Sequence, residues 1–224
     1  MITRSVTNYQ EIDFAAGQTI LVDKPLDLTS FDVIYRLRRF LHIKKIGHAG
    51  TLDPKATGLL IVCTGKSTKK IDSYMGLPKE YTGTMVLGEQ TPSMDTETEV
   101  HISSDSSHVT VEMLNKAVEE LTGEIEQIPP MYSAVAKNGT RLYSLARQGK
   151  TIEREPRKVV VEQFEITGYS HPVISFMVVC SKGTYIRVLA HDLGEKLGCG
   201  AHLSSLRRTA IGDFRVEDAL TIQE

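Results

Sequence analysis

The segment Gly58–Thr64, with the sequence GLLIVCT, is a continuous apolar run. A run of this length without polar alternation predicts a strand in the centre of a sheet. The chain has 224 residues and 41% hydrophobic content. It can therefore bury a substantial core around such a strand, as one large domain or two small ones.

Helical and strand patterns intermix along the rest of the chain. Thr29 and Asp32 have the spacing of a capping box, which predicts a helix to about His42. Regular apolar spacing predicts a helix from Thr110 to a stop at Gly123, and another over Gly183–Leu197. We also expect strands at Thr19–Val22, Tyr81–Leu87, Val159–Ile166, Val173–Cys180 and His202–Ile211, helices at Ser67–Met75 and Arg141–Arg147, and a surface excursion over 89–107. This order predicts a single α/β or α+β domain over residues 1–224, with a mixed, largely antiparallel sheet flanked by helices.

The sequence indicates neither a membrane protein nor a secreted one. No apolar run approaches the roughly 20 residues that cross a bilayer, and residues 1–10 lack the apolar segment of a secretion signal. Three separated cysteines, Cys63, Cys180 and Cys199, favour reduced thiols over disulfides. We therefore expect a cytoplasmic protein. The histidines show no spacing typical of a metal site, so we expect no metal.

Charge is unevenly distributed, although the formal net charge is only −2. Residues 33–52 contain five Lys or Arg and two His without any acid, and residues 137–158 contain seven Lys or Arg against two Glu. Ten carboxylates meet the single cation Lys116 over residues 89–126. Basic segments that share one face would indicate a nucleic-acid binder. A solvated helix face explains either segment alone equally well.

The loop Gly47–Pro54, with the sequence GHAGTLDP, presents the carboxylate of Asp53 next to two glycines and a histidine. Gly47 and Gly50 permit backbone angles that other residues resist and leave room for a bulky ligand, while Pro54 fixes the chain after the acid. This composition suggests a catalytic or binding carboxylate. An ordinary turn opened by Asp53-Pro54 is the alternative, and the eight residues alone favour it.

Two common catalytic plans are disfavoured. Thr64-Gly65-Lys66-Ser67 imitates the end of a phosphate-binding P-loop, but the glycine needed five positions before Gly65 is replaced by Leu60. Lys66 is then a surface or RNA-facing cation. No serine lies in a nucleophile elbow, which argues against acyl transfer.

Six separated motifs resemble the TruB family of tRNA pseudouridine synthases in order and spacing, over about Thr19–Ala210. They are Asp23-Lys24-Pro25 with Thr29-Ser30, Gly47-His48-Ala49-Gly50-Thr51-Leu52-Asp53-Pro54 with Thr57-Gly58-Leu59-Leu60, Lys79-Glu80-Tyr81, Pro129-Pro130-Met131-Tyr132-Ser133-Ala134-Val135, Ser181-Lys182-Gly183-Thr184-Tyr185-Ile186-Arg187 and Leu206-Arg207-Arg208. The resemblance implies a pseudouridine-synthase catalytic domain that isomerises a uridine in the T loop of transfer RNA, at position 55, without a cofactor.

The resemblance also implies roles for individual residues. Asp53 is the catalytic aspartate that attacks the nucleotide, and Arg187 stabilises its charge. Tyr81 stacks on the target base, and Tyr185 lies against the reacting nucleotide. Both tyrosines could instead be packed core residues with bonded hydroxyl groups.

Further matches concern the RNA around the target. His48 resembles the histidine that fills the space left by the extruded uridine. Lys24 flanks the pocket and is expected to bond the backbone around Tyr81, and Leu206 is an apolar pocket wall. Lys24, its neighbour Pro25 in the same segment, and Leu206 could each be purely structural. The segment Pro130–Arg154 corresponds to an RNA-gripping insertion whose cations suit phosphate contacts.

The chain departs from the family pattern in three places. Asp27 stands where glycine is usual, and Lys55 slightly favours the guide-RNA-dependent relatives. Too few residues follow Ala210 for the C-terminal RNA-binding domain of the PUA type that many relatives carry, so we expect none. Met131-Tyr132-Ser133-Ala134 favours the stand-alone bacterial group, which implies a monomer without an obligatory protein partner.

Two rival functions remain. A non-catalytic RNA chaperone on the same fold would bind and anneal transfer RNA without forming pseudouridine. A glycoside hydrolase using Asp53 with a second acid would release free uracil or ribose, but no partner carboxylate accompanies the motif.

Overall fold

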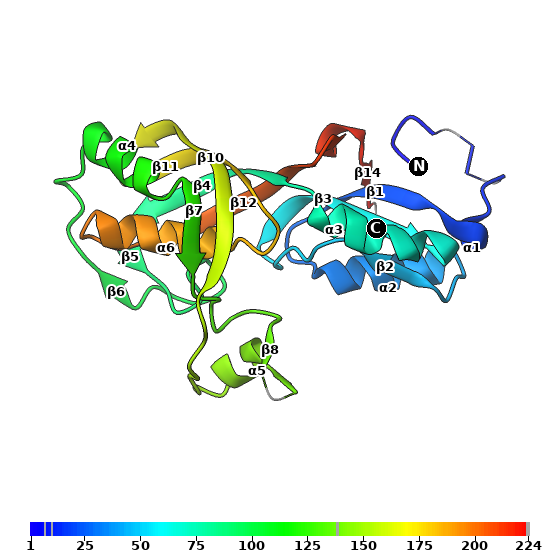
Figure 1. The fold of residues 1–224 in the computed structure, drawn as a ribbon, viewed down its shortest axis with the longest axis horizontal. Coiled ribbons are helices and arrows are strands. Elements are labelled where there is room, and N and C mark those ends of the chain that lie inside the picture. The colour runs from blue at the N-terminus through cyan, green and yellow to red at the C-terminus, as the bar shows by residue number, and fades with distance from the viewer. Residues whose placement is uncertain (7, 10, 138, 223–224) are drawn as a thin grey trace. The chain divides into compact units, whose positions relative to one another are not determined.

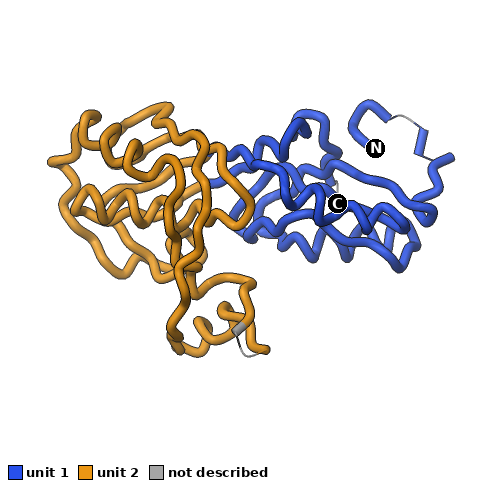
Figure 2. The backbone as a smooth tube through the Cα atoms, viewed as in Figure 1, with its two compact units in different colours: residues 1–82, 206–224 blue, residues 83–205 orange. Residues whose placement is uncertain are grey.

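The computed structural model describes residues 1–6, 8–9, 11–137 and 139–222. Unit 1 comprises residues 1–82 and 206–224, and unit 2 comprises residues 83–205 (Figure 2). Strands β4 (Lys79–Leu87) and β12 (Ala201–Ile211) each run from one unit into the other. Two compact units can belong to one domain, so this division does not test the prediction of a single catalytic domain.

Unit 1 has the strand order β14, β1, β3, β12 and β4, with β2 beside β3. Strand β3 is antiparallel to β1 and β2 and parallel to β12. Figure 1 labels most of these elements. The remaining bounds in this unit are α1 Phe14–Gly17, β1 Thr19–Lys24, α2 Ser30–Phe40, β2 Ile46–His48, β3 Ala56–Thr64, η1 Gly65–Lys70, α3 Ile71–Gly76, β13 Phe214–Arg215, η2 Val216–Asp218 and β14 Leu220–Thr221.

The core of unit 1 covers β3 on both faces. Leu60 and Val62 pack in a cluster with Val33 and Ile34 of α2. Ile61 and its neighbours on the other face pack against Ile71, Tyr74 and Leu77 on and after α3. The five residues 59–63 are fully buried. The predicted central strand is therefore confirmed, and its apolar run is explained by helices on each side.

Unit 2 has the strand order β12, β4, β11, β10 and β7. The predicted pairing of β10 (Arg157–Ser170) with β11 (Val173–Cys180) is antiparallel, as is that of β10 with β7 (Gly123–Gln127). Helix α4 (Val111–Glu120) packs on β10 and also contacts α6 (Ile186–Lys196). The other elements are the pairs β5 Glu89–Gln90 with β6 Ile102–Ser103 and β8 Ala136–Lys137 with β9 Thr140–Arg141, and helix α5 Leu142–Ala146. A mixed fold on a largely antiparallel sheet is confirmed.

Local capping signals in the sequence correctly predicted where α2 and α4 begin. The capping box at Thr29 and Asp32 is present with both of its bonds, and the Thr110 side chain accepts from Met113 N–H at the start of α4. Helix α4 ends at Glu120, however, before the predicted stop at Gly123. No helix of the described residues has the length and hydropathy needed to span a bilayer.

Three expectations need correction. The helix expected over Ser67–Met75 is a 3-10 helix followed by α3, and the one expected from Gly183 begins at Ile186. The segment 89–107 is more than a surface excursion, because several of its polar residues are buried. These are Thr91, Ser93, Asp95 and Ser106.

Candidate active site

The loop that carries Asp53 leaves the edge of a sheet. Residues of β2 pair with β3, and the Ala49 N–H donates to the Ile61 carbonyl at 2.8 Å, so the first part of the predicted loop is strand-like. Gly50 then adopts a φ of +94°. This left-handed conformation favours glycine and turns the chain toward Asp53. The Asp53 side chain lies in a half-buried position, and its backbone carbonyl accepts from Ala56 N–H at 3.0 Å.

The residue before Asp53 is fixed to the start of α2. The buried Ser30 hydroxyl accepts the Leu52 N–H at 2.8 Å and donates to the Leu52 carbonyl at 3.1 Å. Both backbone groups of one residue are thereby satisfied by a single side chain. The position of the Asp53 backbone is thus tied to a helix of the same unit.

A buried arginine holds the other side of the loop. Arg208 is 1% exposed, and its Nε donates to the Leu59 carbonyl at 2.7 Å. Its terminal nitrogens donate to the carbonyls of Gly50, at 3.2 Å, and Thr51, at 3.5 Å. A planar guanidinium can reach three carbonyls at once, which a lysine ammonium on a flexible stem does less well.

Gly58 makes the close pairing of β3 with β12 possible. Its φ is +104°, and a Cβ placed there would lie 2.3 Å from the Arg208 carbonyl oxygen. In the same register, Leu206 lies opposite Ala56, three residues after Asp53. Leu206 is half-buried there. Leu206, the predicted apolar wall, therefore lies on the strand next to the one that the Asp53 loop enters.

Lys24 is a buried cation beside the loop. Its Nζ donates to the carbonyls of Pro25, at 2.9 Å, and Leu28, at 2.7 Å, with a longer contact of 3.5 Å to Pro54. The expected bond to the backbone around Tyr81 is therefore wrong, because the ammonium is directed to its own turn. Burial lowers the pKa of Lys24 to about 8, and the attraction of Asp53 is the largest effect opposing that shift.

His48 and Tyr81 are both placed on strands of unit 1. His48 ends β2, and its pKa is lowered, first by burial and then by the charge of Arg208. The imidazole is therefore neutral near pH 7. Tyr81 lies on β4 and is buried in this structure, 8% exposed. That burial agrees with both interpretations of Tyr81, the packed residue and the stacking platform.

The two unusual residues Asp27 and Lys55 contact each other. Lys55 Nζ lies 2.7 Å from Asp27 Oδ1, and the Asp27 N–H donates to the Pro54 carbonyl at 2.9 Å. Asp27 has a φ of +62°, in the left-handed region where glycine is favoured. The turn after Pro25 thus has the backbone shape that glycine gives, and Lys55 neutralises the acid that replaces it.

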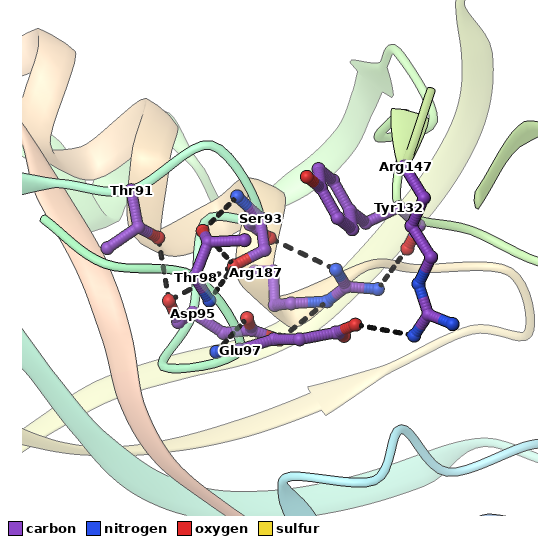
Figure 3. A network of polar contacts seen from close by, with 8 residues as sticks. All are labelled: Thr91, Ser93, Asp95, Glu97, Thr98, Tyr132, Arg147 and Arg187. Carbon is purple, nitrogen blue, oxygen red and sulfur yellow. Dashed lines mark hydrogen bonds and ion pairs between the residues drawn. The ribbon is translucent and has the colours of Figure 1, made fainter. Parts of the chain in front are cut away.

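Arg187 lies in unit 2, at the centre of a polar network (Figure 3). Its side chain is 3% exposed, with Nε 3.5 Å from Asp95 Oδ2. The terminal nitrogens donate to the carbonyls of Ser93, at 3.0 Å, and Tyr132, at 2.8 Å. The guanidinium therefore joins the 93–98 turn to the predicted RNA-gripping insertion.

The turn that carries Asp95 is itself highly bonded. The Asp95 carbonyl accepts from the hydroxyl groups of Thr91, at 2.6 Å, and Ser93, at 3.2 Å, and its Oδ1 accepts the Glu97 N–H at 2.9 Å. Glu97 then bonds Arg147 of the insertion at 3.1 Å. Asp95 is 4% exposed, so its charge is available to Arg187 with little solvent screening.

Tyr185 precedes α6 and is fixed through its backbone. The buried Gln127 side chain accepts the Tyr185 N–H at 2.9 Å and donates to the Tyr185 carbonyl at 3.2 Å. Its ring is half-buried. A tyrosine held in this way has a defined ring position while keeping part of its surface accessible.

The insertion 130–154 contains the β8–β9 hairpin and α5, apart from Asn138, which lies outside the described residues. Leu142 N–H donates to the Val135 carbonyl, and Arg154 donates to the Pro129 carbonyl. Arg147, besides its bond to Glu97, lies over the Tyr143 ring at 5.6 Å. Within the wider basic segment 137–158, Lys158 also bonds an acid, Glu124. Part of the predicted RNA-binding charge is therefore already engaged.

Among the described residues, no group of three or more His, Cys, Asp or Glu side chains is gathered as a metal ion would require. The thiols of Cys63, Cys180 and Cys199 are buried and are not joined in a disulfide. Asp23 and Asp27, two acids that precede α2, bond the cations Arg207 and Lys55. Cations and backbone carbonyls therefore surround the loop that carries Asp53.

Comparison with protein families decides which family the chain belongs to. The model described as TruB family pseudouridylate synthase (N terminal domain) matches residues 38–186, about two thirds of the chain. The chain belongs to the TruB family. A second model, the tRNA pseudouridylate synthase B C-terminal domain, matches residues 187–224, which contain α6, β12, β13 and β14.

Curated relatives in the TruB family match nearly the whole chain. The protein from Flavobacterium johnsoniae, called tRNA pseudouridine synthase B, is 49% identical over 217 residues, which are 94% of this chain and 95% of the relative. A relative of the same name from Chlorobaculum tepidum is 50% identical over 92% of this chain and 88% of its own. The resemblance inferred from the motifs is confirmed.

Solved structures agree with the TruB family fold. The chain is similar to a protein of a Cbf5-Nop10-Gar1 complex, with 31% identity and a TM-score of 0.72 over 93% of this chain and 53% of that one. A chain of an H/ACA RNP bound to a substrate RNA containing 2′-deoxyuridine gives 29% identity and a TM-score of 0.68 over 93% of this chain and 51% of that one. This chain thus spans about half the length of these solved chains.

For this member of the TruB family, the motif resemblance named candidate reacting residues but not the residues that support them. Ser30 and Arg208 lie in motifs that were recognised, but neither was assigned a role. Asp95 lies in a polar segment without helical or strand periodicity. A buried polar residue there leaves no pattern signal, because its burial depends on Arg187, 92 positions later.

Proposed function

We propose that this TruB family enzyme isomerises uridine to pseudouridine in the T loop of transfer RNA, with Asp53 as the catalytic carboxylate. The observation that carries the proposal is the support of the Asp53 loop in unit 1. Ser30, Arg208 and Lys24 hold its backbone or its charge. Together with the family match, this support distinguishes Asp53 from an ordinary turn aspartate.

The reaction needs Asp53 in its ionised form. The Lys24 charge favours the anion, because opposite charges in a partly buried site attract each other with little screening. The carboxylate acts at the sugar of the target nucleotide, the C–N glycosidic bond breaks, the uracil turns, and C5 bonds to C1′ as it loses its proton. Leu206 on the adjacent strand would form an apolar wall against the base.

In the same proposal, Arg187 stabilises the charge of Asp53. Asp95 and the carbonyls of Ser93 and Tyr132 fix the Arg187 guanidinium in one orientation within unit 2. Tyr81 stacks on the target base and Tyr185 lies against the reacting nucleotide. Both side chains are held by the strand or helix start that carries them.

The target uridine must leave its stack before Asp53 can reach its sugar, and this extrusion costs a few kcal/mol. A neutral His48 fills the vacated place, since a lowered pKa lets the ring stack without carrying a charge. Exposed cations of the insertion 130–154 contact phosphates, so affinity falls steeply with salt. A cytoplasmic location and a monomer without an obligatory protein partner complete the proposal.

The test uses Asp53→Asn, with Asp72→Asn as the matched control on exposed α3. Each variant is incubated with transfer RNA, and mass-resolved sequencing scores pseudouridine at every uridine. We expect Asp53→Asn to lose at least about a thousandfold in rate while still binding RNA, and Asp72→Asn to match the wild type. Undiminished activity of Asp53→Asn would contradict the assigned role.

Two other results identify the rivals. If the wild type binds and anneals transfer RNA but forms no pseudouridine, the protein is an RNA chaperone. Free uracil in the reaction indicates a hydrolase instead. Pseudouridine at a position outside the T loop keeps the reaction and overturns the substrate site.

A further inference from the structure

Helix α2 carries aromatic side chains on its solvent side. Phe31 is 62% exposed and Tyr35 is 49% exposed. Arg39 follows at the same spacing of four residues, with its guanidinium over the Tyr35 ring at 5.8 Å. Residues four apart lie on one side of a helix, so Phe31, Tyr35 and Arg39 form a continuous stripe. Val33 and Ile34 of the same helix face the core instead.

Two large aromatic rings on one side of a helix offer a surface on which a ligand can stack. Single exposed apolar residues are ordinary on protein surfaces, but adjacent ones in register with an arginine are the composition of a stacking surface. The stripe extends over nine residues of helix, from Phe31 to Arg39, a rise of about 12 Å. This length corresponds to three or four stacked nucleotides at about 3.4 Å each.

The charge around the stripe favours RNA over a protein partner. No acid occurs from Val33 to Leu52, whereas Arg36, Arg38, Lys44 and Lys45 are close in sequence. The acid nearest in sequence, Asp32, is engaged by the Thr29 backbone and hydroxyl in the capping box. Cations beside flat rings suit the phosphates and bases of an unpaired RNA strand.

The stripe also begins beside the catalytic loop. Phe31 directly follows Ser30, whose hydroxyl makes both bonds to Leu52, the residue before Asp53. An RNA strand on the stripe would therefore approach the loop within the same unit. Because the substrate here is RNA, this step rests on the proposed function.

We propose that Phe31, Tyr35 and Arg39 bind unpaired nucleotides of the RNA substrate by stacking, outside the pocket that receives the target uridine. The rings lie between bases, and the Arg39 guanidinium extends the stack through its own plane. This contact adds affinity without reading a base sequence, since every base offers a π-face.

The absence of tryptophan from the sequence allows a direct test. Phe31→Trp and Tyr35→Trp each introduce a single fluorophore, and Phe40→Trp is the control. Phe40 is 80% exposed on the same helix, but it lies five residues after Tyr35 and points to another side. We expect transfer RNA to quench the tryptophan at 31 or 35 and to leave the one at 40 unchanged. Equal quenching at all three positions, or none, overturns the proposal.

Affinity measurements provide a second readout. Phe31→Ala with Tyr35→Ala should weaken binding of transfer RNA at least about fivefold per ring, with an unchanged slope of log Kd against log salt, because no phosphate contact is lost. Tyr35→Phe should retain affinity and Phe40→Ala should match the wild type. Circular dichroism checks that each variant keeps its helices.

Other outcomes would contradict RNA stacking or give the stripe a different binding partner. Unchanged RNA affinity in the double alanine variant contradicts stacking. If that variant instead abolishes a self-association seen in the wild type by sedimentation, the stripe belongs to a second copy of the chain. Quenching is independent of catalysis, so a wild type that binds RNA without forming pseudouridine disproves the proposed function and leaves this surface intact.

Discussion

The Ser30 hydroxyl bonds both backbone groups of Leu52, at 2.8 Å to its N–H and 3.1 Å to its carbonyl. The start of α2 and Leu52, the residue before the proposed catalytic Asp53, therefore share one buried polar contact. Removing such a contact destabilises the fold, because each buried polar group left without a partner lowers the free energy of unfolding by about 1–3 kcal/mol.

Ser30→Ala should accordingly lower the free energy of unfolding by about 2 kcal/mol and reduce kcat for pseudouridine formation. The reason is the unsatisfied backbone of Leu52, which lets the Asp53 carboxylate leave its position. Urea unfolding and single-turnover rates check both effects. The control is Ser73→Ala, which removes an exposed hydroxyl bonded to the Lys70 carbonyl. It should change the free energy of unfolding by no more than about 0.5 kcal/mol and leave kcat unchanged.

Arg208→Lys should cost about 2–4 kcal/mol of stability although it keeps the charge. A lysine cannot reproduce the bonds to Leu59, Gly50 and Thr51 and would leave buried carbonyls without donors. The exposed Arg215→Lys, which keeps a contact to Glu80, is the control. Equal melting temperatures for the two variants would show that the loop does not depend on Arg208.

The lowered pKa of Lys24 predicts that activity and stability change in opposite directions as the pH rises. Its pKa is about 8 in the folded protein against an ordinary value of 10.5. Above about pH 8 the ammonium that attracts Asp53 is lost, so kcat should fall. Stability should rise between pH 8 and 10.5, because there the unfolded chain binds more protons at Lys24 than the folded one does.

The comparison with Lys24→Met isolates this residue from other groups that titrate in alkali. The variant should lack the alkaline fall in kcat that the wild type shows near pH 8, and its stability should lack the corresponding rise. Rates and urea midpoints from pH 6.5 to 10 provide the data. Matching pH profiles for both proteins would assign the change to another group.

Asp27→Gly and Asp27→Ala should differ although both remove the ion pair with Lys55. Both variants lose an exposed pair worth about 0–1 kcal/mol. Only alanine keeps the strain of a φ of +62°, so it should be less stable than glycine by about 1 kcal/mol. Chemical denaturation measures this difference, and equal stabilities would mean that the left-handed turn is not maintained.

Local sequence signals predicted most of the fold. The apolar run of β3, the capping box of α2 and the alternation of β10 and β11 depend on neighbouring residues, and all three were confirmed. The predictions failed where distant residues decide the structure. Strand β2 exists because it pairs with β3, and the 89–107 segment is partly buried because Arg187 binds Asp95 within it.

The candidate site divides in the same way. Motif resemblance identified Asp53, His48 and Leu206, and the fold places all three on or next to β2, β3 and β12. The partners of Lys24 were predicted wrongly, because the direction of a long side chain depends on the carbonyls that its turn leaves open. The roles assigned to all of the site residues stay predictions: Asp53, His48, Leu206, Lys24, Tyr81, Tyr185 and Arg187.

The bonds from Arg208 to Gly50 and Leu59 join positions 158 and 149 residues apart. During synthesis, the segment bearing the acid leaves the ribosome long before the guanidinium that orders it. In a growing chain, the Asp53 loop consequently lacks these bonds until β12 has been made. Contacts between residues so distant in sequence form slowly, because the chain between them must be brought together first, so we expect the loop to gain its final order late in folding.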